Sequence, residues 1–216
     1  EMQMKPHYLD DDIIIHKIKC GPYDNNAYLL VCPETNESII IDTPSDPSVL
    51  LAVASVTSVR SIVITHNHID HLLGFDEVID IFDVPVSIGM DDADALPKPA
   101  DFLLQTGSQI KAGKITLEAI HTPGHTDGSI CYLFQKHLFT GDTLFPGGPG
   151  KTQSPANLTQ IIDSLTTKIF TLSSDILIYP GHGDDGVLED SKKDYAIFAS
   201  KEHDANLCGD VEWVKH

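Results

Sequence analysis

The fold is decided by one stretch, Thr65-His66-Asn67-His68-Ile69-Asp70-His71, which follows directly on the apolar segment 61–65. Four potential metal ligands fall within its last six positions. His66 and His68 are two residues apart, so on extended backbone they share one side of the chain. Asp70 and His71 follow where the loop turns, and they can face a second point. The composition, with a formal net charge of −18, gives no reason to expect a histidine-rich segment. We therefore interpret this stretch as a metal-binding loop at the end of a buried strand.

Three further ligand-type residues have the same placement. His125 follows the predicted strand 115–120, Asp142 follows 137–139, and His182 follows 176–178. Each is flanked by glycine or proline, which hold backbone in unusual geometry near a ligand. One such histidine alone is more often structural, but together with the first stretch the set predicts a metal centre. Five imidazoles and two carboxylates suit two divalent cations, roughly 3.5–4 Å apart, with a water between them.

The composition excludes several classes of partner. The chain has 216 residues and only 14 Lys and Arg against 32 Asp and Glu. Phosphate binding rests on clusters of basic residues, so we expect no nucleic-acid partner and no anionic membrane surface. No apolar run is long enough to span a bilayer, and the N-terminus does not resemble a signal peptide. The four cysteines form no CxxC pair, which favours a reducing compartment. We expect a cytoplasmic protein, a single domain over residues 1–216, and a monomer or homodimer.

The hydrophobic pattern predicts short strands first and then an alternation of helix and strand, in both halves of the chain. Expected strands are 13–19, 26–32, 38–42, 61–65, 84–88, 129–134, 137–140 and 175–179, with a hairpin at 110–120 around Gly113. Expected helices are 48–59, 72–82 and 158–170, the last capped by Asn157, with shorter helical turns at 91–96 and 195–198. Residues 143–155 are expected to form one long surface loop. Two β-layers with outer helices give an α/β fold, a four-layer αββα sandwich.

These motifs resemble the metallo-β-lactamase fold superfamily. The order His66-x-His68-x-Asp70-His71 followed by His125, Asp142 and His182 carries the resemblance. The sequences Gly141-Asp142-Thr143-Leu144-Phe145 and Pro180-Gly181-His182 are similar to its glyoxalase II-like (hydroxyacylglutathione hydrolase-like) branch. The similarity runs from about residue 13 to about 186. Too few residues follow His182 for the C-terminal helical domain of glyoxalase II, so we expect a short form without it.

The resemblance implies a role for each ligand. His66, His68 and His125 would bind one metal, Asp70, His71 and His182 would bind the second, and Asp142 would bridge the two. It also implies that Asp42 supports the ligands from behind; an ordinary turn residue at a strand end is the equally weighted alternative. The expected cofactors are two divalent ions, Zn²⁺ first, with Fe or Mn as alternatives.

The resemblance implies a dinuclear metal-dependent hydrolase that cleaves a thioester (or ester) with a metal-bridging hydroxide as nucleophile. Asp70 would orient that nucleophile as well as bind metal. Lys151 occupies the place of a basic residue that binds a glutathione carboxylate in glyoxalase II, although a solvated loop lysine is its alternative reading. The expected substrate is a small anionic acyl thioester. Phe145 stands where lactonases of this fold carry tyrosine, and β-lactamases of the fold lack an equivalent of Asp142, so both of these activities are disfavoured.

Two alternatives stay open at this point. The segment Gly148-Pro149-Gly150-Lys151-Thr152 also resembles the loop of persulfide dioxygenases, which bind one iron through positions matching His66, His125 and Asp142 and oxidise glutathione persulfide. A metal-binding protein without catalysis is the third class. The excess of ligands over a closed four-coordinate site argues against it, since structural zinc sites saturate their metal.

Overall fold

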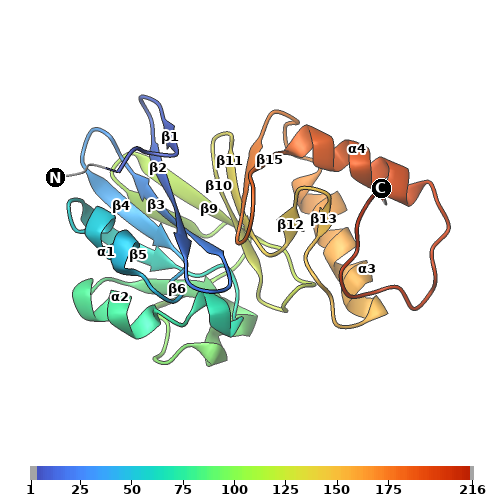
Figure 1. The fold of residues 1–216 in the computed structure, drawn as a ribbon, viewed down its shortest axis with the longest axis horizontal. Helices are drawn as coiled ribbons and strands as arrows, with labels where there is room; N and C mark the ends of the chain where they lie inside the picture. Colours follow the sequence, from blue (N-terminus) through green and yellow to red (C-terminus); the bar gives the residue numbers. More distant parts are fainter. Residues whose placement is uncertain (1–3, 215–216) are drawn as a thin grey trace.

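Two β-sheets pack face to face at the centre of the computed structural model, which describes residues 4–214 (Figure 1). The first sheet holds, side by side in chain order, β1 (Tyr8–Leu9), β2 (Ile14–Cys20), β3 (Asn25–Val31), β4 (Glu37–Ile41), β5 (Ser58–Val63), β6 (Val86–Gly89) and β7 (Phe102–Leu104). The second sheet has the spatial order β15 (Gly186–Val187), β14 (Leu177–Pro180), β11 (His137–Gly141), β10 (Ile130–Phe134), β9 (Ile115–His121) and β8 (Gln109–Ala112).

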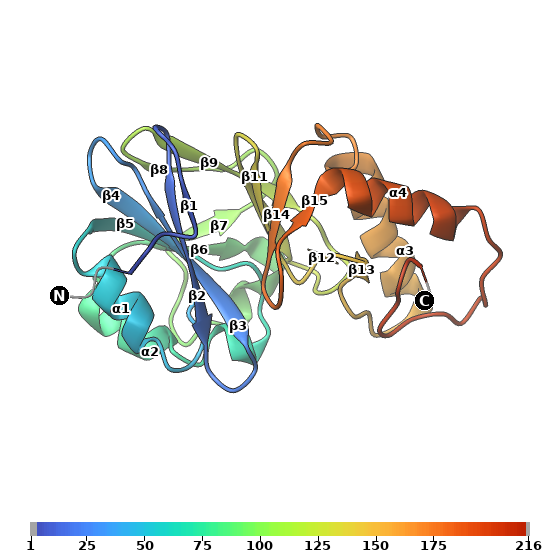
Figure 2. The same ribbon diagram turned by 45° about the horizontal axis from the view of Figure 1, so that its top comes forward.

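Helices cover the outer face of each sheet (Figure 2). The first sheet is covered by α1 (Ser48–Ala54) and α2 (Phe75–Ile81), and the second by α3 (Pro155–Ser164) and α4 (Leu188–Ala199). Shorter elements are η1 (Ile69–His71), η2 (Met90–Ala95), the π-helical turn η3 (Leu165–Ile169) and the small hairpin β12 (Leu144–Phe145) with β13 (Gly148–Pro149). This is the predicted αββα sandwich. None of the helices in the described part of the chain is long and apolar enough to cross a bilayer.

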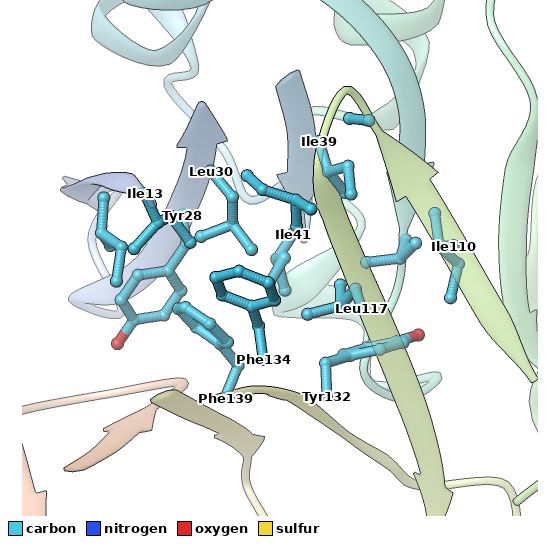
Figure 3. Close-up of a cluster of buried hydrophobic side chains, with 14 of the residues drawn as sticks. Ile13, Tyr28, Leu30, Ile39, Ile41, Ile110, Leu117, Tyr132, Phe134 and Phe139 are labelled. Atoms are coloured by element: carbon cyan, nitrogen blue, oxygen red, sulfur yellow. The ribbon is translucent and has the colours of Figure 1, made fainter. Parts of the chain in front are cut away.

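Three apolar clusters hold these four layers together. The central cluster lies between the sheets, where Tyr28 of the first sheet meets Phe139 of the second with ring centroids 5.1 Å apart (Figure 3). Leu50 and Phe75 attach α1 and α2 to the first sheet, and Ile161 attaches α3 to the second. Full burial of one such side chain contributes about 1.5–3 kcal/mol, so the two sheets and their helices are fixed relative to one another.

Parallel strand pairing brings the ends of distant segments together. In the first sheet β4 runs parallel to β5, with Ile41 opposite Val63. In the second sheet β11 runs parallel to β14, with Gly141 opposite Pro180. Parallel neighbours end at the same edge of a sheet, so the loops that follow them start side by side. Of the ligand-type residues singled out in the sequence, those after β5, β11 and β14 follow parallel strands, whereas His125 follows β9, which is antiparallel to both of its neighbours.

Several predicted boundaries are wrong. The helix expected over 48–59 ends at Ala54, because Val59 already belongs to β5, where its β-branched side chain fits the pleated surface. The helix expected over 195–198 begins much earlier, at Leu188, because a charged run hides its sparse apolar period.

Two predictions in the segment 143–170 also fail. Asn157 does not cap α3: Ser154 does, and its Oγ accepts a hydrogen bond from the Asn157 backbone N–H at 3.1 Å. The stretch 143–155 is not one surface loop, because it contains the β12–β13 hairpin and buries residues 148–150.

His137 gives the fold a testable pH dependence. It is fully buried on β11, its Nδ1 is 2.8 Å from the Tyr179 hydroxyl, and burial lowers its pKa to about 4. Between this value and the usual 6.5 the unfolded chain binds one more proton than the folded chain. Stability therefore falls on acidification through that window, by at most about 3 kcal/mol from this residue.

Replacing His137 with Gln should flatten this part of the curve. We expect urea denaturation to show a smaller loss of unfolding free energy between pH 6.5 and 4 for His137→Gln than for the native chain. Parallel curves for the two proteins would contradict the assignment.

Candidate metal centre

The seven predicted ligands converge at the edge where strands of both sheets end. His66 and His68 lie in the loop after β5, Asp70 and His71 in η1, His125 in the loop after β9, Asp142 after β11, and His182 after β14. Their ligand atoms form three overlapping groups, and within each group these atoms lie within 4.8 Å of one another. All seven belong to at least one group, although they come from four separate segments of the chain.

Two of the groups have no residue in common. The first comprises His66, His68 and His125, whose ring centroids are 4.5–4.9 Å apart. The second comprises Asp70, His71 and His182. In this second group Asp70 Oδ2 lies 3.4 Å from His71 Nε2 and 3.2 Å from His182 Nε2. The two groups have the same members as the two ligand sets that the family resemblance implied.

Asp142 lies between the two groups. Its Oδ2 is 3.7 Å from His125 Nε2 in the first group and 3.4 Å from His182 Nε2 in the second. Its Oδ1 is 3.4 Å from His71 Nε2. One carboxylate thus faces ligands of both groups, which is the placement that a bridging ligand requires.

The chemistry of these atoms fits divalent cations. His66 Nε2, His71 Nε2, His125 Nε2 and Asp142 Oδ1 are buried and have no hydrogen-bond partner within residues 4–214. A buried polar atom left unpaired costs about 1–3 kcal/mol, and here four of them belong to the residues of these groups. Imidazole nitrogen and carboxylate oxygen are the ligands that Zn²⁺ and similar ions take in proteins. The residues therefore fit a metal site.

In four of the five histidines the other ring nitrogen, Nδ1, is hydrogen-bonded to a neighbouring protein group. His125 Nδ1 donates to the carbonyl of Lys151 at 2.7 Å, and His182 Nδ1 donates to the carbonyl of Tyr23 at 3.0 Å. His66 Nδ1 lies 3.0 Å from the Thr65 hydroxyl. His71 Nδ1 lies 2.9 Å from a carboxylate oxygen of Asp42. Such bonds fix the ring orientation and leave Nε2 facing the centre.

Comparison with known proteins places the chain in a family. Residues 20–182 match the model of the metallo-beta-lactamase superfamily. The chain belongs to this superfamily. A hydroxyacylglutathione hydrolase of Polaromonas sp. is 35% identical over 177 residues, which cover 79% of this chain and 66% of that protein. The chain thus spans about two thirds of the length of this relative.

Solved structures of other proteins share the fold. The BLEG-1 B3 metallo-beta-lactamase has a TM-score of 0.76 and 28% identity, covering 83% of this chain and 96% of its own. ETHE1 from Myxococcus xanthus has a TM-score of 0.78 and 27% identity, covering 88% and 86%. The architecture described above is therefore shared with a metallo-beta-lactamase and with ETHE1.

Asp42 has both of the roles that its sequence position allowed, as a turn residue and as a support of the ligands. It stands at the end of β4 with a φ of +64°, so it does turn the chain there. Its carboxylate is also buried against the site: Oδ1 accepts from the Thr65 backbone N–H at 2.7 Å and Oδ2 from the Thr65 hydroxyl at 2.8 Å. With its contact to His71, one side chain joins the strand end, the first loop and the second ligand group.

The histidines of the two ligand groups differ in the direction of their pKa shifts. Burial is the main reason why the pKa of His66 lies well below its usual value, and the neighbouring His71 adds to the effect. Burial also acts against a protonated His71, but the Asp42 and Asp142 carboxylates outweigh it and raise the pKa of His71. At His182 burial is likewise outweighed by Asp142 and Asp70, which raise its pKa to about 10. The negative field is therefore strongest at the second group, where it favours a bound cation.

Sequence reasoning missed the contribution of the first two residues of β3. Asn25 is buried, and its Nδ2 donates to Asp70 Oδ2 at 2.8 Å. Asn26 Nδ2 donates to the carbonyls of Pro180 at 3.0 Å and Gly183 at 2.9 Å, on both sides of His182. The only sequence signal was the run Asp24-Asn25-Asn26, two amide side chains at the start of an apolar strand.

Lys151 lies at the rim of the site. Its carbonyl accepts the His125 hydrogen bond, while the residue as a whole is exposed. Beside it a cavity of about 330 Å³ is lined by the β12–β13 hairpin and by the chain end at Val211, Glu212 and Val214. Phe145 connects this cavity to the metal centre, with its ring centroid 6.5 Å from that of His182. Trp213 docks the chain end onto α4 through Tyr195 and Phe198.

Asp42→Asn tests how far the ligands depend on their supports. The amide keeps the size of the side chain, but an NH₂ group replaces one carboxylate oxygen. This new donor would face a donor of Thr65 or His71, so at least one hydrogen bond is lost. We expect the affinity for divalent ions to fall by about 10-fold or more, as measured by chelator competition. Asp46→Asn, an exposed change in the same loop, is the control and should leave the affinity unchanged. Equal affinities for all three proteins would show that Asp42 only shapes the turn.

Proposed function

We propose that this protein is a dinuclear metal-dependent hydrolase that cleaves thioester (or ester) bonds. The observation that carries the proposal is the position of Asp142 between two separate three-ligand groups. A single ion would leave about half of these ligands unused, whereas two ions would use them all. The hydroxyacylglutathione hydrolase of Polaromonas sp. supports the choice of a thioester through its name and its 35% identity.

Two bound ions, Zn²⁺ in our proposal with Fe or Mn as alternatives, would polarise the substrate carbonyl and supply a water that is acidic enough to ionise near neutral pH. The chain's own residues would orient the reactants. Asn25 fixes one oxygen of Asp70, so this carboxylate is held in one orientation toward the centre. We assign to Asp70 the alignment of the attacking water by accepting a hydrogen bond from it.

The substrate in this proposal is a small anionic acyl thioester. Lys151 is exposed at the rim and would attract the substrate's carboxylate. On a chain of net charge −18 such a local positive group is needed to offset repulsion. The cavity beside Phe145, whose lining is part polar and part apolar, would accept the uncharged part of the substrate.

We also propose that the protein works in the cytoplasm. All four cysteines are free thiols, and three of them are buried, which suits a reducing compartment.

One alternative has a specific observation in its favour. A persulfide dioxygenase with one iron would need only His66, His125 and Asp142. In this structure Asp142 Oδ2 lies 3.8 Å from His66 Nε2 and 3.7 Å from His125 Nε2, so these three are close together as well. The likeness to ETHE1 is compatible with this alternative.

Metal stoichiometry and reaction type separate the two activities. The proposal predicts two ions per chain by elemental analysis and hydrolysis of an acyl-glutathione thioester, followed by release of free thiol. It also predicts that Asp70→Ala loses the second ion and most of kcat. One iron per chain, oxygen uptake with glutathione persulfide, and no loss of metal in Asp70→Ala would establish the alternative instead.

Lys151→Ala tests the proposed substrate contact. Removing one exposed charge should raise KM for an anionic thioester by about 5-fold, equivalent to about 1 kcal/mol, with little change in kcat. A thioester without a carboxylate should show no such change. Lys111→Ala, at another exposed position, serves as control. Identical KM values in Lys151→Ala and the native protein would leave Lys151 as a solvated loop residue.

A further inference from the structure

Asp92 is a buried carboxylate that touches two of the ligand loops. It lies in η2, between β6 and β7, and is only 1% exposed. Its Oδ2 accepts hydrogen bonds from the backbone N–H of Asn67 at 3.0 Å and from the hydroxyl of Thr126 at 2.6 Å. Its Oδ1 accepts from the backbone N–H of Gly128 at 2.9 Å. These bonds therefore go to the two loops that carry His66, His68 and His125.

These partners belong to different halves of the molecule. Asn67 stands between His66 and His68 in the loop after β5, a strand of the first sheet. Thr126 directly follows His125 in the loop after β9, a strand of the second sheet. The first ligand group combines histidines from these two loops. Asp92 thus ties together the two backbone segments whose separation sets the geometry of that group.

His68 depends on this contact more than the other four histidines do. Each of the others has a hydrogen bond at its Nδ1, as described above. Within residues 4–214 no hydrogen bond orients the His68 ring, so its position follows from its backbone. That backbone is held at the preceding residue, Asn67, by Asp92. His68 and His125 are also a close pair, with ring centroids 4.5 Å apart.

The packing around Asp92 leaves it little freedom. A Cβ added to Gly128 would lie 2.6 Å from the Asp92 carboxyl carbon and 2.5 Å from its backbone nitrogen. A Cβ on Gly89 would lie 1.9 Å from the carbonyl oxygen of Gly128. Two glycines therefore bring η2 directly against the His125 loop. A larger residue at either place would push Asp92 away from its partners.

We propose that Asp92 is a positioning residue that sets the distance between the His66–His68 loop and the His125 loop, and thereby the affinity of the first ligand group for its metal. The inference rests on the proposed metal centre but not on any substrate. It assigns a role to a buried carboxylate that joins the two loops behind these ligands.

The test is metal titration of the full-length chain by competition with a chromophoric chelator, using Zn²⁺ and no substrate. Asp92→Asn keeps the size of the side chain but has a single carbonyl oxygen, so Asn67 N–H or Gly128 N–H loses its acceptor. We expect the affinity for one of the two ions to fall by about 10- to 100-fold, the range found when supports of metal ligands are removed. The Co²⁺-substituted protein should show an altered ligand-field spectrum.

Asp101→Asn is the matched control. Asp101 Oδ2 accepts the backbone N–H of Val86 at 2.8 Å, the same kind of bond at the other end of β6. This variant should lose stability without loss of metal affinity. Gly128→Ala is the second route to the same effect, because it displaces Asp92 sterically and leaves its carboxylate intact. It keeps the inference testable if Asp92→Asn does not fold.

The outcomes separate this inference from the proposed function. Native affinity for both ions in Asp92→Asn or Gly128→Ala, or an equal loss of affinity in Asp101→Asn, would overturn the positioning role. A native chain that binds two ions but cleaves no thioester would contradict the proposed function and leave the role of Asp92 intact.

Discussion

The structure depends on keeping one carboxylate, that of Asp142, among histidines of two ligand groups. Its side chain is only 11% exposed, and His71, His125 and His182 surround it. A buried charge of this kind is costly unless opposite charge or hydrogen-bond donors compensate it. Gly181 clears the space for it, because a Cβ there would lie 2.3 Å from Asp142 Oδ1. The strand order, the glycines and the supporting bonds all serve to place ligands around this point.

The two sheets contribute to the site in different ways. The first sheet supplies a continuous loop of four ligands after β5, and the second supplies three separate ligands, each after its own strand. Since the ligands of both groups come from both sheets, the centre has a fixed geometry only if the sheets are fixed relative to each other. The cluster around Tyr28 and Phe139 does this by packing, and Tyr132 adds a hydrogen bond of 2.6 Å to the Ile64 carbonyl across the interface. A change that loosens the packing of the two sheets is therefore expected to disturb the geometry of the site as well.

The convergence of the seven candidate ligands could be predicted from the sequence because each follows a strand, and strand ends are visible as apolar runs that stop at glycine, proline or histidine. The residues that support these side chains through hydrogen bonds could not be predicted. Asn25 and Asp70 are 45 positions apart, and Asp92 and Asn67 are 25 apart, so their contacts exist only after the sheets have formed. The layered architecture followed from the alternation of strands and helices. The boundaries of α1 and α4 did not, since β-branched residues at 56–59 fit a helical stripe as well as a strand, and charged residues mask the period of α4.

The central claim is that Asp142 is shared by two metal sites, one formed with His66, His68 and His125 and the other with Asp70, His71 and His182. Anomalous X-ray diffraction from crystals grown with Zn²⁺, recorded on both sides of the zinc absorption edge, measures this directly. We predict two zinc peaks per chain, roughly 3.5–4 Å apart, with the Asp142 carboxylate in contact with both. A single peak bound by only part of the set, or two peaks of which one lies away from Asp142, would contradict the account.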